Sequence, residues 1–393
     1  MIAVKRLHSA REEDFKKEEE MLKELAKNEH PHIIKLLATF KMAGRYHLMF
    51  PWANRNLRTY WNDHPSPEWN PKTLMWCLEQ MKGLASALEA IHNFKQQACN
   101  NPSQLVSPGY ARSGTYRFGR HGDIKPENIL WFADLDNCGE SGMFQIADFG
   151  VARFNSRESR SRVDPRTIVS TPTYEPPEIA LELKITRAYD IWSLACVFLE
   201  HITWTLGGSK MLKDFSSARL FEERDGYFCD KFYKILGDKR RAIVPEAVFK
   251  WMSHLHKHEK CSEVIHDLLD LVQDHLLVIN AEDRMTSTIL AAELLKFTER
   301  AHTDKAYLCD PIPDSDTVTD VAERVTMVIP TTKPFPNQIK PVQSPKFKSP
   351  GKFSQLKRRC RPSISSDYSI APSRSIEDIF LSLARESLGS RVG

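Results

Sequence analysis

Apolar residues recur at structural periods from the N-terminus to about residue 300, where the texture of the chain changes. The first elements that this pattern predicts are a strand at Ile2–Lys5, a helix at Glu12–Lys27, and strands at Ile33–Phe40 and Tyr46–Trp52. The helix is strongly charged, but one side of it carries an apolar stripe made of Phe15, Met21, Leu22 and Leu25. The N-terminal part is therefore predicted to pack a single helix against a small sheet.

After residue 53 the pattern is almost entirely helical. A long helix is predicted at Thr73–Phe94, because apolar residues recur there at positions 74, 78, 81, 84, 88 and 91. Residues 188–206 and 261–276 have the same periodicity. The most apolar stretch, Ile191–Ile202, is interrupted by Ser193, Glu200 and His201, so we expect a buried helix there and no membrane span.

Two segments differ from this pattern. Residues 93–116 are rich in Asn, Ser, Pro and Gly, which predicts a long loop. Residues 331–362 hold nine Lys or Arg residues, six prolines and no Asp or Glu, which is typical of a disordered basic linker. Within the tail 301–393, a short helix is predicted at 376–388, with Ser375 as its cap.

Composition and charge exclude several classes of protein. With 41% hydrophobic and 27% charged residues the 393-residue chain is globular, and a net charge of +4 argues against a nucleic-acid binder. The basic tail could still make weak electrostatic contacts with nucleic acid or acidic lipid, and Lys357-Arg358-Arg359 could act as a nuclear address. The eight cysteines form no CxxC pair, and no secretory signal precedes the first strand. These features predict an intracellular protein, either cytoplasmic or nuclear.

The candidate chemistry lies in one loop and in the turn that follows the next apolar strand. The loop is His121-Gly122-Asp123-Ile124-Lys125-Pro126-Glu127-Asn128-Ile129-Leu130, and the turn is Ile146-Ala147-Asp148-Phe149-Gly150. Asp123, Asn128 and Asp148 would bring oxygen ligands together, and such ligands suit Mg²⁺, which often also binds phosphate oxygens. Lys125 would add a cation beside a transferring phosphate.

Here the chain resembles the eukaryotic protein kinases, because a series of their motifs occurs in the right order over residues 1–300. These motifs are Ile2-Ala3-Val4-Lys5, Phe15-x-x-Glu18-x-x-x-Leu22, His30-Pro31, the loop and turn just described, Ser170 to Glu178, Asp190-Ile191-Trp192-Ser193, and Asp283-Arg284. The catalytic loop HGDIKPENIL is most similar to that of a divergent fungal group of kinases. The resemblance implies an α+β, two-lobed protein-kinase-like fold.

The implied domains are a partial small lobe with its hinge at 1–53, a large helical lobe at 54–300, and the mostly disordered tail at 301–393. Within this fold, Asp123 would accept the proton of the substrate hydroxyl, Lys125 would support the γ-phosphate, and Asn128 and Asp148 would bind Mg²⁺. Lys5 would hold the α- and β-phosphates of ATP, and Glu18 would orient Lys5. The adenine site would consist of Ala3, Leu130, the gating residue Phe50 and the hinge residues Pro51, Trp52 and Ala53.

The resemblance also implies a set of structural contacts and a substrate class. Leu22, Leu36, His121 and Phe149 would form a hydrophobic stack anchored by Asp190, and Arg284 would pair with Glu178. Lys125 and Thr171 accompany serine/threonine specificity in this family, so the expected partner is a protein substrate with a Ser or Thr hydroxyl. In the family a hydroxyl matching Thr171 bonds to the groups that match Asp123 and Lys125.

Three departures from the family pattern bear on function. The sequence starts at the lysine strand and contains no G-x-G-x-x-G loop, which predicts that upstream sequence encodes two further strands with a Gly-rich turn. Gly122 replaces the arginine that reads a phosphate on the activation loop, so activity is predicted not to depend on that phosphate. The third departure is the long polar loop before the catalytic loop.

Two alternatives to an active protein kinase stay open. A pseudokinase would keep the fold as an interaction scaffold without turnover. A small-molecule phosphotransferase of the aminoglycoside or choline kind also has a loop that begins His-Gly-Asp, with an Asn five residues after the Asp. Lys125-Pro126-Glu127 and the segment from Thr171 to Glu178 favour a protein substrate over a small molecule.

Overall fold

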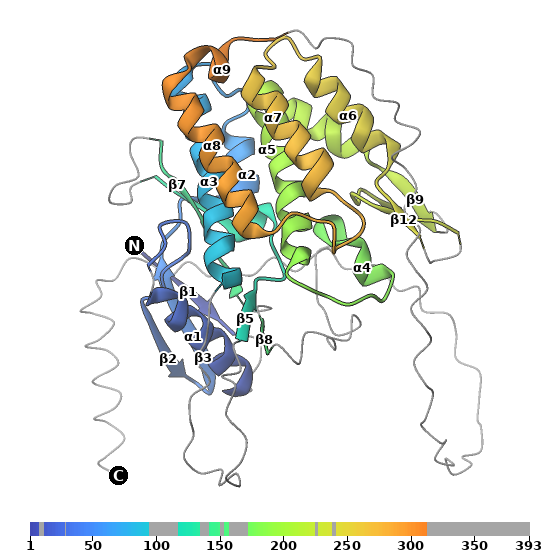
Figure 1. The fold of residues 1–393 in the computed structure, drawn as a ribbon. Helices are drawn as coiled ribbons and strands as arrows, with labels where there is room; N and C mark the ends of the chain where they lie inside the picture. The colour runs from blue at the N-terminus through green and yellow to red at the C-terminus, as the bar shows by residue number, and fades with distance from the viewer. Residues whose placement is uncertain are drawn as a thin grey trace, which may run out of the picture.

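The computed structural model describes residues 1–7, 12–27, 29–93, 117–133, 141–149, 153–156, 172–224, 227–237 and 241–312. Figure 1 shows a small part, made of strands with a helix packed on them, lying against a larger part built mostly of helices. The expected loop at 94–116, the loop residues 157–171 with Thr171, and the predicted tail helix 376–388 lie outside the described residues.

The small lobe is an antiparallel sheet with one helix packed against it. Strands β1 (Ile2–Arg6), β2 (Ala38–Met42) and β3 (Arg45–Pro51) are arranged in the order β1-β3-β2, and α1 covers Glu12–Ala26. The predicted apolar stripe of α1 is buried, and the Phe15 ring stacks on Tyr46 with centroids 4.3 Å apart. The predicted order of strand, helix, strand, strand is therefore confirmed.

One strand differs from its prediction, because β2 begins at Ala38 and not at Ile33. The backbone of residues 32–34 pairs instead with the large lobe. The Ile34 amide donates to the Ile146 carbonyl at 3.0 Å, and the Ile146 amide donates to the His32 carbonyl at 2.8 Å. The apolar run from Ile33 therefore serves as a junction between the two lobes.

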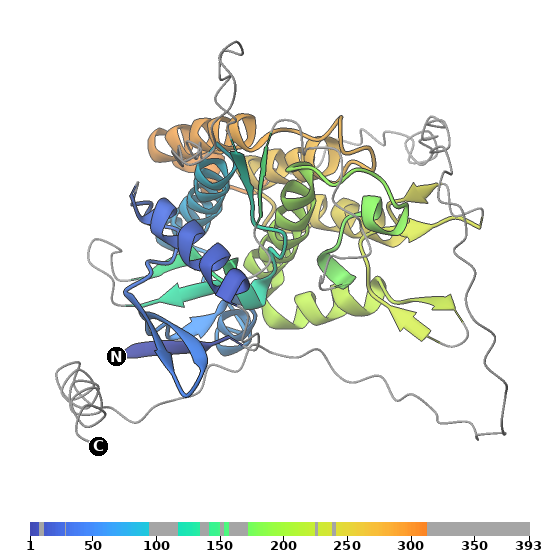
Figure 2. The ribbon, with the colours of Figure 1, turned by 90° about the horizontal axis from the view of Figure 1, so that it is seen from below.

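The large lobe is built around two long helices, α3 (Pro71–Asn93) and α5 (Ala188–Ala218). Shorter helices surround them: α2 (Leu57–Asp63), α4 (Pro177–Ala180), α6 (Glu246–His256), α7 (Glu263–Leu271) with the π-helical turn η6 (Val272–Leu276), α8 (Ser287–Thr303) and α9 (Lys305–Cys309). Figure 2, which looks from below, shows α5 near the middle of this lobe. The long predicted helices are thus present, and their apolar faces form one continuous core.

Helix α5 is longer than the predicted 188–206, because the chain continues as helix beyond a break at Gly208 (φ 70, ψ −164). Every residue from Tyr189 to Leu206 is buried, which confirms the expectation that Ile191–Ile202 is a core helix. Among the described residues, no helix has the length and apolar character needed to cross a bilayer.

Short sheets also occur in the large lobe, and the sequence pattern did not predict most of them. One sheet has the order β4-β6-β7 and carries the candidate chemistry on β6 (Ile129–Phe132) and β7 (Met143–Ile146), with β4 at Arg55–Asn56. The other pairs are β5 (Arg117–Arg120) with β8 (Arg153–Ser156), β9 (Phe221–Arg224) with β10 (Tyr227–Cys229), and β11 (Lys234–Ile235) with β12 (Ala242–Ile243). Helices predominate after residue 53, as expected, and these short sheets are added to them.

Ordered structure continues past residue 300, where the large lobe was predicted to end. Helix α8 runs to Thr303 and α9 follows directly. The Ser262 hydroxyl donates to the Leu308 carbonyl at 2.9 Å, and the Trp69 indole donates to the Cys309 carbonyl at 3.2 Å. Tyr307 and Leu308 are buried, so this short helix belongs to the core of the lobe.

Candidate active site

The loop that precedes β6 is held in place by Asp190, which lies near the start of α5. This carboxylate is fully buried and accepts the backbone amides of His121, at 2.9 Å, and Gly122, at 2.7 Å. His92 donates to it from Nε2 at 2.8 Å. Burial alone would raise the pKa of Asp190, but the hydrogen bond from His92 and the nearby charges lower it overall. Asp190, which was predicted to anchor the hydrophobic stack, is therefore an ionised carboxylate that also holds this loop.

His121 connects this loop to the turn that carries Asp148. Its Nε2 donates to the Ala147 carbonyl at 3.0 Å, and its ring meets the Phe149 ring edge-on with centroids 4.9 Å apart. Burial lowers the pKa of His121, which favours the neutral ring. These contacts, together with buried Leu22 and the half-buried Leu36, are consistent with the predicted hydrophobic stack.

Lys5 lies between two carboxylates that come from different elements. Its Nζ is 2.7 Å from Glu18 Oε1 on α1 and 2.7 Å from Asp148 Oδ1 after β7. Burial alone would lower the pKa of Lys5, but Glu18 and Asp148 outweigh it and raise the pKa above its usual value. Lys5 is therefore a permanent cation, and among three consecutive glutamates it is Glu18 that it selects.

Asp123, Lys125 and Asn128 form a second cluster on the loop itself. Lys125 Nζ is 2.7 Å from Asp123 Oδ2, and Asn128 Nδ2 donates to the same oxygen at 2.8 Å and to the Asp123 carbonyl at 2.9 Å. A short 3₁₀ turn, η1 (Pro126–Asn128), places the asparagine back against the aspartate. The spacing of five residues between Asp123 and Asn128 therefore brings the two side chains into contact.

The two clusters are adjacent, because β6 and β7 pair directly behind them. The Ala147 amide donates to the Asn128 carbonyl at 2.8 Å. Asp148 has φ 65, a left-handed conformation that is costly for a residue other than glycine. This conformation occurs where the Asp148 side chain reaches Lys5, so the surrounding structure maintains a strained backbone at the centre of the site.

The residues predicted for the adenine site come from β1, from the end of β3 and the segment after it, and from β6 in the other sheet. Ala3 lies opposite Phe50 in the sheet, and both are buried, as is Leu130 on β6. Pro51, Trp52 and Ala53 follow Phe50 and are half-buried. The Trp52 amide donates to the Met1 carbonyl at 3.3 Å. Pro51, Trp52 and Ala53 thus follow the last strand of the small lobe, and Leu130 lies in the large lobe.

Below the loop, the predicted pair of Glu178 and Arg284 is present and fully buried. Arg284 Nη1 and Nη2 each donate to one oxygen of Glu178 at 2.8 Å, which is the bidentate arrangement. The Ser193 hydroxyl donates to the Tyr174 carbonyl at 2.8 Å. These bonds fix the segment from Pro172 to Glu178 on top of α5.

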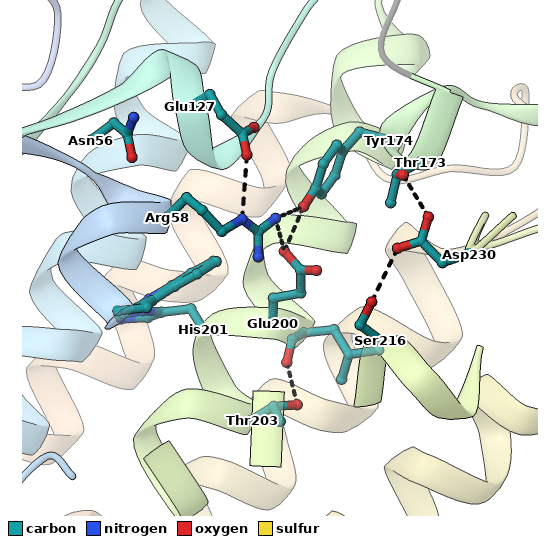
Figure 3. A network of polar contacts seen from close by, with 12 residues as sticks. Asn56, Arg58, Glu127, Thr173, Tyr174, Glu200, His201, Thr203, Ser216 and Asp230 are labelled. Atoms are coloured by element: carbon teal, nitrogen blue, oxygen red, sulfur yellow. Dashed lines mark hydrogen bonds and ion pairs between the residues drawn. The ribbon is translucent and has the colours of Figure 1, made fainter. Parts of the chain in front are cut away.

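A polar network beside the loop was not predicted. Arg58 on α2 contacts Glu127, Tyr174 and Glu200, as Figure 3 shows. The sequence carries no local signal for this network, because Arg58 and Glu200 lie on different helices and are separated by 142 residues. Of these four residues, only Glu127 and Tyr174 fall within motifs that the sequence singled out.

The comparisons with known proteins agree with this geometry. Residues 116–296 match the family model described as protein kinase domain. The chain is 29% identical over 204 residues to cyclin-dependent kinase E-1 of Arabidopsis thaliana, which covers 49% of this chain and 40% of the relative. It is 29% identical over 185 residues to cyclin-dependent kinase 4 of Xenopus laevis, covering 46% of each chain.

A third relative is serine/threonine-protein kinase fray1 of Dictyostelium discoideum, 37% identical over 128 residues, which is 30% of this chain and 21% of the relative. The chain thus spans less than half the length of these curated relatives. Residues 116–296 are therefore similar to the protein kinase domain, and the two-lobed fold and the assembled lysine–carboxylate site agree with that similarity.

Proposed function

We propose that this chain transfers the γ-phosphoryl group of ATP, with Mg²⁺, to serine and threonine hydroxyls of proteins. The observation that carries the proposal is the position of Lys5 Nζ, at 2.7 Å from both Glu18 and Asp148. The cation on β1 thus contacts one carboxylate from the neighbouring helix α1 and another that lies 143 residues away in the sequence. A half-buried, permanently charged lysine beside a carboxylate that can hold a metal suits the phosphates of a nucleotide.

Asn128 and Asp148 would hold Mg²⁺. The amide nitrogen of Asn128 is engaged by Asp123, which leaves its carbonyl oxygen as the group that a cation would meet. Within the described ranges no three His, Cys, Asp or Glu side chains gather into a metal cluster, so phosphate oxygens and water would complete the coordination. Bound with ATP, Mg²⁺ supplies positive charge that offsets the charge of the phosphates.

The remaining roles follow from the contacts of each side chain. Asp123 would accept the proton of the substrate hydroxyl, and Lys125, 2.7 Å away, would stabilise charge on the transferring group. Glu18 would orient Lys5. Ala3 and Leu130 would flank the adenine, Phe50 would close the back of its pocket, and Pro51, Trp52 and Ala53 would present backbone groups to its edge.

The proposed preference for serine and threonine rests on Lys125, on Thr171 and on the similarity to the serine/threonine-protein kinase fray1. Thr171 lies outside the described residues, so its proposed bonds to Asp123 and Lys125 stay a prediction. The similarity to a divergent fungal group also stays a prediction. The expected partner is a protein, and the buried Glu178–Arg284 pair supports a rigid platform on which it would lie.

The substitution Asp148→Asn tests the proposed function. Neutralising this carboxylate removes charge aimed at the phosphates and should lower phosphate transfer at least about a hundredfold. The measurement is transfer of radiolabelled phosphate to a generic basic protein, together with the melting temperature. Asp63→Asn is the matched control, because Asp63 is exposed and pairs with exposed Arg55 outside the site.

The alternatives give different results in the same assay. If the unmodified chain transfers no phosphate but nucleotide raises its melting temperature, the chain is a pseudokinase scaffold. If it phosphorylates choline or an aminoglycoside and no protein, it is a small-molecule phosphotransferase. If Asp148→Asn keeps full activity with the same magnesium dependence, the assignment of the metal site is wrong.

A further inference from the structure

Arg58 occupies a position between the catalytic loop and the proposed substrate platform. Its Nε is 3.3 Å from Glu127 Oε1 on the loop, and its Nη2 reaches the Tyr174 hydroxyl and, at 3.3 Å, Glu200 Oε2. Figure 3 shows the guanidinium of Arg58 between these three groups. The Arg58 side chain is 32% exposed, so part of it faces the solvent beside the site.

Glu200, the acidic group at the centre of this network, is satisfied entirely from within the protein. Its side chain is 3% exposed, and Oε2 accepts from Arg58 and, at 2.8 Å, from the Tyr174 hydroxyl. The other oxygen accepts from Arg219 Nη2 at 3.2 Å. Arg219 is buried, with its guanidinium 3.9 Å from the Phe215 ring and 4.2 Å from the Phe232 ring.

A third carboxylate, Asp230, also accepts hydrogen bonds from groups of the protein itself. It accepts from the hydroxyl of Thr173 at 2.7 Å and from the hydroxyl of Ser216 at 3.2 Å, and Arg219 lies 3.7 Å away. Thr173 belongs to the platform segment, so the network reaches from the catalytic loop across to the platform. Three carboxylates (Glu127, Glu200 and Asp230) are thus held by two internal arginines and three hydroxyls.

This arrangement has a consequence for recognition. Carboxylates beside a substrate platform attract basic residues of the substrate, because opposite charges in a partly desolvated site interact strongly. Here Arg58 already makes the contacts that a substrate arginine would make, and its exposed part repels a second cation. Specificity is a difference of affinities, so an internal cation removes a preference that bare carboxylates would create.

We propose that Arg58 is a specificity-determining residue that takes the place of a basic substrate residue, so that this chain does not select lysine or arginine near the phosphoacceptor. The proposal rests on the proposed function, because it assumes that a protein segment lies across Glu127 and Tyr174. It predicts that removing Arg58 uncovers Glu127 and Glu200 and creates a selectivity for basic substrates.

The test is a set of serine peptides in which a single arginine replaces alanine at each flanking position in turn. For the unmodified chain, affinity by fluorescence anisotropy and kcat/KM should be nearly the same for all peptides. Arg58→Met keeps the length of the side chain and should improve binding of one arginine peptide by about fivefold or more relative to its alanine parent. The double variant Arg58→Met/Glu127→Gln should lose most of that gain.

Arg55→Gln is the matched control, because it removes the same charge from an exposed pair with Asp63 that has no contact with Glu127 or Glu200. The proposal is overturned if the unmodified chain already prefers an arginine peptide, or if folded Arg58→Met shows the flat profile of the unmodified chain. If Arg58→Met does not fold, Glu127→Gln alone decides. That variant should leave the flat profile unchanged, and a change in selectivity would contradict an internally neutralised Glu127.

The two readouts separate this proposal from the proposed function. Absence of phosphate transfer to every peptide would contradict the proposed function. Peptide affinity requires no turnover, so the selectivity of binding still tests the role of Arg58 in that case.

Discussion

Gly122 shows how one residue can have two independent consequences. The resemblance to protein kinases drew attention to the arginine that is missing at this position, and hence to a lost contact with a phosphate. The structure adds that Gly122 has φ 84, in the left-handed region, while its amide donates to Asp190. Glycine adopts this conformation at little cost, whereas a side chain there is strained. Relative to the arginine of the family, Gly122 therefore lacks a positive charge, and it also adopts the left-handed backbone of the loop without strain.

Gly122→Ala should reduce the free energy of unfolding by about 1 kcal/mol, because alanine must adopt the left-handed conformation to keep the bond to Asp190. The measurement is denaturant unfolding, with Gly237→Ala as the control. A Cβ at Gly237 meets no atom within 4 Å, and this glycine does not have a positive φ. Equal losses in the two variants would show that the conformation of Gly122 has no energetic cost.

Helix α5 owes its length to a second glycine. At Gly208 the helix breaks, and an added Cβ would lie 2.0 Å from the Pro65 carbonyl oxygen. This close approach allows the Ser209 amide to donate to the same carbonyl at 3.0 Å and holds the second half of α5 against the chain that leaves α2. The predicted helix ended at 206, directly before this glycine pair, and glycine normally weakens a helix.

Gly208→Ala should therefore reduce the free energy of unfolding by at least about 2 kcal/mol. The added Cβ would clash with the backbone of Pro65, and a φ of 70 is strained for alanine. The neighbouring Gly207→Ala is the matched comparison. Its Cβ would meet the side chain of Met211, which is flexible enough to move, so the expected loss is under about 1 kcal/mol. Thermal unfolding of both variants checks the difference, and a reversed order would contradict this account of the break.

At the level of elements, the predictions succeeded where a pattern is local and long. The stripe of α1 and the periodicity of α3 specified those helices to within a few residues. The four strands of the hairpins between 221 and 243 are two to four residues long, too short to show a period. The segment from Ile33 looked like a strand because it is apolar, yet its backbone partners lie in the other lobe.

At the scale of the whole molecule, the candidate active site could be predicted only in part from the residues themselves. Asp123, Lys125 and Asn128 are close in the sequence, so their spacing alone brings them together. The contact of Lys5 with Asp148 spans 143 residues, and only the resemblance to a known family could indicate it. Arg58 and Arg219 belong to no motif, so their contacts with Glu200 emerged only from the folded chain.

Two buried histidines make the stability of the whole molecule depend on pH. Burial lowers the pKa of His32, at the junction of the lobes, from 6.5 to about 4, although its hydrogen bond to the Phe144 carbonyl opposes this. Burial lowers the pKa of His201, in the middle of α5, from 6.5 to about 3. Both rings are therefore neutral in the folded chain over a range in which the unfolded chain would bind protons.

The direction in which the free energy of unfolding changes with pH follows from the uptake of protons on unfolding. Below about pH 6.5 the unfolded chain binds more protons than the folded chain, so the free energy of unfolding falls as the pH falls toward the folded pKa values. At about pH 5, each of these histidines should lower the free energy of unfolding by roughly 2 kcal/mol relative to its value at about pH 7. His32→Asn removes one of these titrations while its amide nitrogen can still donate to Phe144.

Denaturant unfolding at about pH 7 and about pH 5 should therefore show a pH-dependent loss that is roughly 2 kcal/mol smaller in His32→Asn than in the unmodified chain. His302→Asn is the matched control, because His302 is exposed on α8 and lies far from the junction. A pH-dependent loss in His32→Asn as large as that of the control would mean that His32 is already protonated in the folded chain. In that case the ring would have to carry its charge against the Ile34–Ile146 junction, and the close packing of His32 on Gly83 would have to open to admit water.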